Sequence, residues 1–512
     1  MKRGSTLLIG FLTASASIVM LAPGCGSSDV SGFDNMVDEA GIPGPNPGGD
    51  FGDSGPRGGK PCTGLCQQQV RCDDGGDTTV SGIVYDPAGK VPLYNVVVYV
   101  PNAELGGIQT GASCDRCDPS LYSGNPLTGV QTDAKGQFKI PNMPVGKDIP
   151  LVIQIGKWRR TIKVPHVARC VDTPLPATET RLPRNQREGN IPLMAITTGG
   201  SDSMECLPLR MGIDISEYSI KGGPGRIHLY KGENDIEEDP SDNAYSTGKF
   251  VSSVAGGASF PASTELWNST DRLKAYDMVI LSCEGSPNPK SKPPEATKAL
   301  YEYESIGGRV FASHWHEYFF RKGPEDVQKT GTWDEEAYEP TSDTYTAMGI
   351  VRTKNGDKDF PKGIAFADWL DNVKATNPRT QLSITEPRGV LTAVNASKAQ
   401  EWITIPTYPR APAVQFMSYN APIGAADDKI CGRAIFTDMH VSAGVPRGTP
   451  RDIVGEQGTQ FPAGCKGYDP KDPEAVRKAD LTPQEKALEF MLFDLASCVS
   501  SDDKPPPPPV IH

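Results

Sequence analysis

The 512-residue chain lacks an excess of basic charge and has few aromatic residues. Its 51 Lys and Arg residues are outnumbered by 63 Asp and Glu residues, which gives a net charge of −12. Proteins that bind nucleic acid usually present a basic face, so we expect no nucleic-acid partner. Aromatic residues make up only 7% of the chain, and no row of sugar-stacking rings is evident. The composition excludes these classes without indicating a reaction.

Several common catalytic motifs are also missing. The sequence has no Gly-x-Ser-x-Gly nucleophile elbow, no phosphate-binding loop ending in Gly-Lys-Ser/Thr and no His-Glu-x-x-His zinc motif. Beyond the N-terminal region, no segment reaches the roughly 18 uninterrupted apolar residues that a membrane span needs. The sequence therefore predicts no membrane-spanning helix.

The N-terminus has the layout of an export signal. Lys2 and Arg3 precede a mostly apolar or small stretch at residues 7–21, and small residues then lead to Cys25. This ending resembles the bacterial lipoprotein signal, in which the Cys is lipidated and becomes the mature N-terminus. We predict a signal peptide at 1–24, a lipid on Cys25 that reaches the membrane, and a location at the outer membrane or cell surface. A plain secretory peptide is the alternative.

The chain contains twelve cysteines, a number typical of disulfide-bonded exported proteins. With Cys25 lipidated, eleven remain, so we expect one thiol to be free or to pair with another chain. Six cysteines lie between residues 62 and 170 and could form three local bridges. The spacings at 62–66 and 114–117 also suit zinc, but thiolate zinc sites occur mainly in reducing compartments, so disulfides are favoured.

Composition divides the mature chain into two expected folded domains and two flexible segments. Residues 25–60 and 499–512 lack apolar periodicity and are rich in residues such as Gly, Pro, Ser and Asp, so we expect a disordered tether and tail. Between them we expect a Cys-rich β-domain at 61–170, a linker at 171–190 and an α/β domain at 191–498.

The β-domain shows short alternating segments separated by turn residues, a pattern typical of a small β-sandwich. We expect strands within 79–85, 95–100, 132–140 and 151–155. The stretches VSGIVYDPAGKVPLYNVVVYV and TDAKGQFKIPNMPVGKDIPLVIQ resemble the carboxypeptidase regulatory-like domain, a transthyretin-like antiparallel β-sandwich. The resemblance implies a structural or binding accessory module.

From residue 191 strands and helices alternate, which predicts an α/β domain with a mostly parallel, flavodoxin-like sheet. We expect strands at 191–196, 226–230, 277–282, 309–313 and 432–437, and helices at about 204–211, 293–306 and 483–496. The sequence from Thr482 to Glu485 predicts a capping box at the start of the last helix. In such sheets ligands bind beyond the carboxyl ends of the strands.

Three blocks of this domain, YDMVILSCEG, GGRVFASHWH and GRAIFTDMHVS, resemble the class I glutamine amidotransferase-like superfamily, including its ThuA-like members. The family implies a nucleophilic Cys in a Gly-x-Cys-x-Gly elbow after the strand that follows paired glycines. Here that stretch reads Ala-Ser-His-Trp-His at 312–316. The missing Cys speaks against glutamine hydrolysis and predicts a degenerate amidotransferase-like domain.

Cys283 lies one strand earlier and is a candidate nucleophile. It would need a lowered pKa and a nearby base, which His314 or His316 could provide. Glu284, if close, would raise the thiol pKa instead. A disulfide with Cys206, or an inert core thiol, is the favoured alternative.

The histidines at the strand ends are candidate metal ligands. His314 and His316 would face the same way if they continued the strand, and Asp438 and His440 could complete the set. Two histidines and a carboxylate suit Zn²⁺ or Fe²⁺. Histidines that hydrogen-bond across a polar cleft are the favoured alternative, and no cofactor is the leading expectation.

The turn after the first α/β strand is a candidate ligand site. Gly199 and Gly200 could hold an anion at the N-terminus of the following helix, although Asp202 would repel a phosphate. More often such glycines simply form the turn.

These observations favour an exported, lipid-anchored binding or structural module of the cell envelope, with an envelope glycan or protein as ligand. The alternative is a hydrolase of envelope glycans or peptides, with or without a metal, whose site lies at the carboxyl ends of the sheet strands. A third hypothesis is that the protein is a structural partner in a surface complex, linked covalently through the free thiol.

Overall fold

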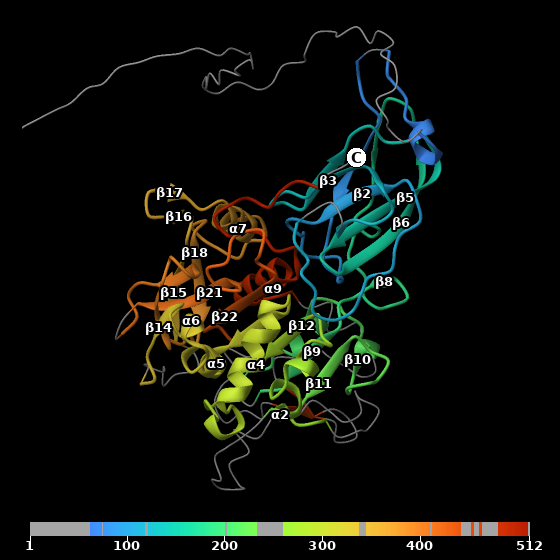
Figure 1. Cartoon of the computed structure of the whole chain (residues 1–512). Coiled ribbons are helices and arrows are strands. Elements are labelled where there is room, and N and C mark those ends of the chain that lie inside the picture. The colour runs from blue at the N-terminus through green and yellow to red at the C-terminus, as the bar shows by residue number, and fades with distance from the viewer. Residues whose placement is uncertain are drawn as a thin grey trace, which may run out of the picture. The chain divides into compact units, whose positions relative to one another are not determined.

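The order of strands, turns and helices largely follows the pattern that the sequence indicates (Figure 1). The computed structural model describes residues 62–232 except 74, 118–120 and 200–201, residues 260–441 except 337–344 and 410–411, residues 452–454 and 460–462, and residues 480–509. All belong to one unit, Pro61–His512. The expected signal peptide, Cys25 and the tether lie outside the described residues. No described helix is long and apolar enough to cross a bilayer.

Two sheets make up residues 62–190, which we call the β part. Their strand orders are β4-β1-β7 and β3-β2-β5-β6-β8, and every pairing except β1 with β7 is antiparallel. The expected linker at 171–190 instead supplies β7 and β8, because its backbone pairs with β1 and β6. The strands are β1 (Thr79–Ile83), β2 (Val97–Pro101), β3 (Pro126–Gln131), β4 (Gln137–Ile140), β5 (Gly146–Ile155), β6 (Trp158–Val167), β7 (Asp172–Pro174) and β8 (Gly189–Asn190).

Residues from 191 onward form the α/β part, built on one ten-stranded sheet. Its order is β10-β11-β9-β12-β13-β22-β21-β20-β15-β18. The first six strands are parallel and the last four run antiparallel to their neighbours. The strands are β9 (Met194–Thr197), β10 (Tyr218–Ser219), β11 (Ile227–Tyr230), β12 (Met278–Leu281), β13 (Arg309–Ser313), β15 (Thr346–Val351), β18 (Gln381–Thr385), β20 (Gln400–Ile405), β21 (Ala413–Ala421) and β22 (Gly432–Thr437).

The five strands expected in this part are therefore present, and the antiparallel half of the sheet is an addition. Its helices and 3₁₀ turns are α1 (Cys206–Arg210), η3 (Ile215–Glu217), α2 (Thr264–Trp267), α3 (Thr270–Leu273), η4 (Pro289–Ser291), α4 (Pro294–Ser305), η5 (His314–His316), α5 (Glu317–Arg321), α6 (Glu325–Gln328), α7 (Pro361–Asn372) and α9 (Pro483–Ala496). Short strand pairs are β14 (Gly331–Trp333) with β19 (Leu391–Val394), β16 (Lys354–Asn355) with β17 (Lys358–Asp359), and β23 (Asp452–Val454) with β24 (Gln460–Pro462).

Both faces of the parallel strands are buried, as the unbroken apolar run of β12 predicts. Met278 and Ile280 belong to one hydrophobic cluster, which also contains residues of α7 and α9. Val279 and Leu281 belong to the other, which contains residues of α2 to α5. The period of two along the strand thus divides its side chains between two layers of helices.

Helix α9 joins the two parts of the protein. Its predicted capping box is present, because Thr482 Oγ1 accepts the Glu485 N–H and the Glu485 carboxylate accepts the Thr482 N–H. Phe493 of α9 packs edge-on against Trp158 of the β part, with ring centroids 5.8 Å apart. Both side chains are at least 97% buried, so the contact between the two parts has an apolar core.

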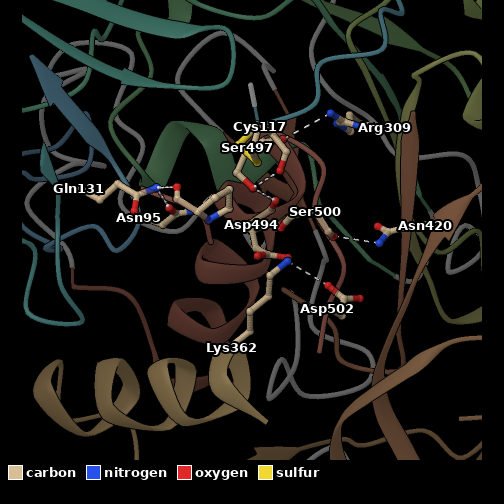
Figure 2. Close-up of a disulfide and its surroundings, with 12 residues drawn as sticks. Asn95, Cys117, Gln131, Arg309, Lys362, Asn420, Asp494, Ser497, Ser500 and Asp502 are labelled. Atoms are coloured by element: carbon tan, nitrogen blue, oxygen red, sulfur yellow. Dashed lines mark hydrogen bonds and ion pairs between the residues drawn. A yellow bond between two sulfur atoms is a disulfide. The ribbon is translucent and has the colours of Figure 1, made fainter. Parts of the chain in front are cut away.

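Disulfides reinforce this junction. Two bridges are local, Cys62–Cys66 and Cys72–Cys170, but Cys114 pairs with Cys431 and Cys117 with Cys498. The three local bridges that these six cysteines could form are therefore not all present, because Cys114 and Cys117 each pair with a cysteine of the α/β part. Figure 2 shows the disulfide of Cys117. Both candidate zinc spacings are used by disulfides. The bridges indicate an oxidising environment.

Part of the expected disordered tail, which the structure describes as far as residue 509, contacts the α/β part at Ser500 and Asp502. The Asp502 carboxylate forms ion pairs with Arg433 and Lys362, and Asn420 donates a hydrogen bond of 3.0 Å to the Ser500 carbonyl (Figure 2). Partial burial opposes ionisation of Asp502, but the Arg433 guanidinium outweighs it and keeps the pKa of this carboxyl low, at about 2. Charge pairing, which apolar periodicity does not reveal, therefore joins Asp502 to the α/β part.

Candidate functional site

Three adjacent parallel strands, β12, β13 and β22, bring the candidate residues to one edge of the sheet. The chain leaves β13 sharply at His314, whose φ of 38° lies in the left-handed region, and continues as the 3₁₀ turn η5. A strand would have pointed His314 and His316 the same way. The turn separates them, so the expectation that both face one ion is wrong.

Cys283, His314 and His440 come together instead. One ligand atom from each lies within 4.8 Å of the other two, and all three residues are buried. Cys283 Sγ is 3.4 Å from His314 Nδ1, within reach of a thiol–imidazole hydrogen bond, and the His314 and His440 ring centroids are 5.2 Å apart. The sequence nominated all three residues, but it placed Cys283 outside the metal set.

Burial keeps Cys283 and His314 uncharged. It raises the pKa of the Cys283 thiol to about 12. Burial, reinforced by His440 and by the positive charge of Arg388, lowers the pKa of His314 well below its usual value. At neutral pH the pair is a thiol and a neutral imidazole. An activated cysteine needs the thiolate, so the arrangement does not favour Cys283 as a nucleophile.

Cys283 is nevertheless a free thiol. It is the free cysteine among the described residues, and Cys206 is engaged in another disulfide. Of the two favoured alternatives to a nucleophile, the Cys283–Cys206 bridge is thus wrong, whereas a buried core thiol agrees with the structure, as does the expectation of a free thiol. Because Cys283 is fully buried, it is not placed to link this chain covalently to another.

His316 and Glu284 have contacts other than with Cys283, His314 and His440. His316 Nε2 lies 2.9 Å from the Ser282 carbonyl, and its ring contacts Trp267. Burial lowers the pKa of His316 to about 4, which identifies it as a neutral core histidine. The Glu284 carboxylate pairs with the Lys292 ammonium at 2.5 Å, and neither side chain is more than 2% exposed. Neither residue belongs to the Cys283 cluster.

Asp438 also lies outside the cluster. Its Oδ2 accepts a weak hydrogen bond of 3.4 Å from the Leu391 N–H. Burial raises its pKa well above the usual range, so the carboxyl is neutral. The candidate metal set is therefore divided: His314 and His440 are together, and His316 and Asp438 are elsewhere.

The turn after β9 holds neighbouring strand ends together. The Asp202 N–H donates to the Cys283 carbonyl at 3.1 Å, and Asp202 Oδ1 accepts the Val441 N–H at 2.8 Å. A Cβ on Gly199 would lie 2.3 Å from the Cys283 carbonyl oxygen, so only glycine fits this approach. Gly200 lies outside the described residues. The Asp202 carboxylate in this turn would also repel an anion. These contacts therefore favour a structural role for the turn over an anion-binding site.

Sequence reasoning missed two groups beside this edge. Glu205 accepts a hydrogen bond of 3.1 Å from the Ser282 hydroxyl, and burial raises its pKa to about 8. Arg388 is 9% exposed, and its positive charge lowers the pKa of both Cys283 and His314. Arg388 lies in a stretch with no recognised motif, so the sequence carried no signal for it.

No protein-family model and no curated protein matches the chain. Among solved structures, the chain is similar to a putative ThuA-like protein from Bacteroides uniformis, with 9% identity over 48% of this chain and 81% of that one and a TM-score of 0.23. It is also similar to a type II cohesin–X–dockerin complex from Acetivibrio cellulolyticus, with 13% identity over 28% of this chain and 75% of that one and a TM-score of 0.14. TM-scores of this size are too low to establish a shared fold or function.

Proposed function

We propose that this protein is an exported, lipid-anchored module of the cell envelope that binds an envelope glycan or protein, or has a structural role there. The observation that carries this proposal is the pair of long-range disulfides, Cys114–Cys431 and Cys117–Cys498. Bridges of this kind form in oxidising compartments. They also fasten the β part to the α/β part, as suits a rigid body on a tether.

The chemistry of the strand edge supports a non-catalytic role. The Cys283 thiol is protonated and its neighbouring imidazole is neutral, which is the opposite of an activated pair. The β part supports assignment as a carboxypeptidase regulatory-like sandwich through its mainly antiparallel sheets. The six parallel strands of the α/β part support a degenerate, flavodoxin-like, ThuA-like domain.

A cavity between the two parts supports the binding role. It has a volume of about 280 Å³ and is lined by residues of the β part and the α/β part, among them Lys90, Arg210, Lys374 and Lys486. Asp86 and Asp480 also line it, and Arg210 is paired with Glu485. The three lysines still outnumber the two lining carboxylates, although the chain as a whole is acidic. An envelope glycan with a carboxylate or phosphate group would suit this lining.

Location and binding can be tested separately. The full chain, expressed with its own N-terminus in a Gram-negative host, should enter the membrane fraction, and Cys25→Ser should move it to the soluble exported fraction. Recovery of the wild type in the cytoplasm with reduced cysteines would refute the proposal. For binding, purified wild type should sediment with isolated envelope glycan, and Lys90→Glu/Lys374→Glu should sediment less. A control pair on another surface, Lys298→Glu/Lys429→Glu, should match the wild type.

The second candidate is a hydrolase of envelope glycans or peptides. It is favoured by the convergence of Cys283, His314 and His440 at the carboxyl ends of parallel strands, where such sheets bind ligands. The test is release of soluble fragments from isolated envelopes by the full chain. Activity that disappears in His440→Asn and persists in His316→Asn would make this candidate the leading one.

A further inference from the structure

The cluster of Cys283, His314 and His440 has the donor types of a transition-metal centre. A thiolate sulfur and two imidazole nitrogens are ligands that Zn²⁺ and copper prefer over water and carboxylate. Each side chain comes from the end of a different strand: β12, β13 and β22 respectively. Three neighbouring strands of one hydrogen-bonded sheet fix the positions of these donors, so the set is preorganised by the fold.

The spacing of the donors matches a single ion. In a tetrahedral zinc site with Zn–S near 2.3 Å and Zn–N near 2.0 Å, the sulfur and nitrogen atoms are about 3.5 Å apart. Cys283 Sγ and His314 Nδ1 are 3.4 Å apart. The other donor separations are at most 4.8 Å, a distance that small side-chain rotations can close. Among the described residues, this is the one group of three or more potential metal ligands with such spacing.

The charge of the site favours a soft cation of low charge. Two neutral imidazoles and one thiolate carry a single negative charge, so Cu⁺ forms a neutral centre and Zn²⁺ leaves one positive charge. Two charged groups also influence Cys283. The negative charge of Asp202 raises the pKa of the thiol, and the positive charge of Arg388 lowers it. A buried centre of nearly zero net charge avoids most of the desolvation cost of an isolated ion.

We propose that Cys283, His314 and His440 bind one thiophilic metal ion, Zn²⁺ or Cu⁺, at the carboxyl edge of the α/β sheet. On binding, the Cys283 S–H bond breaks, the sulfur–metal bond forms and the proton passes to solvent. His316 and Asp438 are excluded from the ligand set. This site is independent of the envelope location proposed above.

The test uses the full chain, purified from whichever cell fraction contains it and stripped with a chelator. Separate samples receive Zn²⁺, or Cu⁺ under a reductant too mild to open the disulfides, and elemental analysis counts the retained ion. We expect one equivalent in the wild type and in His316→Asn, a control histidine equally buried at the same edge. Cys283→Ser and His440→Asn should bind at least roughly a hundredfold more weakly. The sample with the tighter ion decides between the two metals.

Two readouts on the wild type protect the test against variants that fail to fold. Co²⁺ in the site should give a thiolate-to-cobalt charge-transfer band, and bound Zn²⁺ should slow alkylation of Cys283. The proposal is overturned if the wild type binds neither Zn²⁺ nor Cu⁺ and gives no cobalt–thiolate band. It is equally overturned if folded Cys283→Ser retains metal and band unchanged. Neither result would bear on membrane fractionation, which tests the proposed function.

Discussion

The two long-range disulfides should stabilise the protein in a non-additive way. Their sequence separations are 317 residues for Cys114–Cys431 and 381 for Cys117–Cys498. Once either bridge is closed, however, the other closes a much shorter loop. That loop consists of two pieces of chain, three residues from 114 to 117 and 67 residues from 431 to 498, which together make about 70 residues.

Loop-closure entropy converts these lengths into free energies of unfolding. At 25 °C a loop of about 70 residues corresponds to about 4 kcal/mol, and a loop of more than 300 residues to about 6 kcal/mol. Cys114→Ala/Cys431→Ala should therefore cost about 4 kcal/mol, as should Cys117→Ala/Cys498→Ala. Removal of both bridges should cost about 10 kcal/mol, which exceeds the sum of the single losses.

Urea denaturation of the four proteins under non-reducing conditions measures these differences. Cys62→Ala/Cys66→Ala serves as the control, because a separation of only four residues restricts the unfolded chain by about 2 kcal/mol or less. The reasoning is refuted if the single and double losses are equal, or if each long-range bridge contributes no more than the control.

Three further predictions concern the buried groups of the fold. Burial raises the pKa of Glu304 from 4.5 to about 8, so the folded state keeps a proton that the unfolded state loses. Stability should therefore fall as pH rises through the window from about 5 to 8; Glu304→Gln should flatten this fall in thermal melts at several pH values, and an unchanged slope would contradict the assignment. Arg433→Ala leaves Asp494 without its cation and Asp502 with Lys362 alone and should cost about 3–5 kcal/mol in urea unfolding, with faster proteolysis of the C-terminal segment; a loss below 1 kcal/mol would count against the ion-pair network. Phe493→Ala removes the aromatic contact with the β part and should cost about 3–5 kcal/mol, whereas exposed Ile306→Ala, measured in the same way, should cost far less.

Elements with a strong local pattern were predictable from the sequence. The parallel strands β12, β13 and β22 were recognised because both their faces are buried, which gives each a central apolar run, at 278–281, 310–312 and 434–436. Helix α9 was recognised from its capping box, which depends only on residues within one turn. Strand β21 was missed, because its buried sequence includes Gln415 and Ser418, both 0% exposed, which hide its apolar character.

The site was predictable in membership but not in grouping. The residues at the strand ends were identified because parallel strands place their carboxyl ends at one edge. Which of them meet depends on how the chain leaves each strand. At His314 the backbone enters a left-handed conformation and a 3₁₀ turn, so the pairing with His316 gave way to a pairing with Cys283.

By itself the sequence indicated an oxidising environment, the main helices and strands of the α/β part and a free thiol. The number of cysteines and the apolar periodicity can both be taken from the sequence without knowing which residues meet in the fold. Only the tertiary structure decided the disulfide partners, the contacts of Ser500 and Asp502, and the proximity of Cys283 to His314 and His440. These features join residues tens to hundreds of positions apart. Their formation depends on which surfaces meet when the two parts pack around α9, and no local pattern encodes that contact.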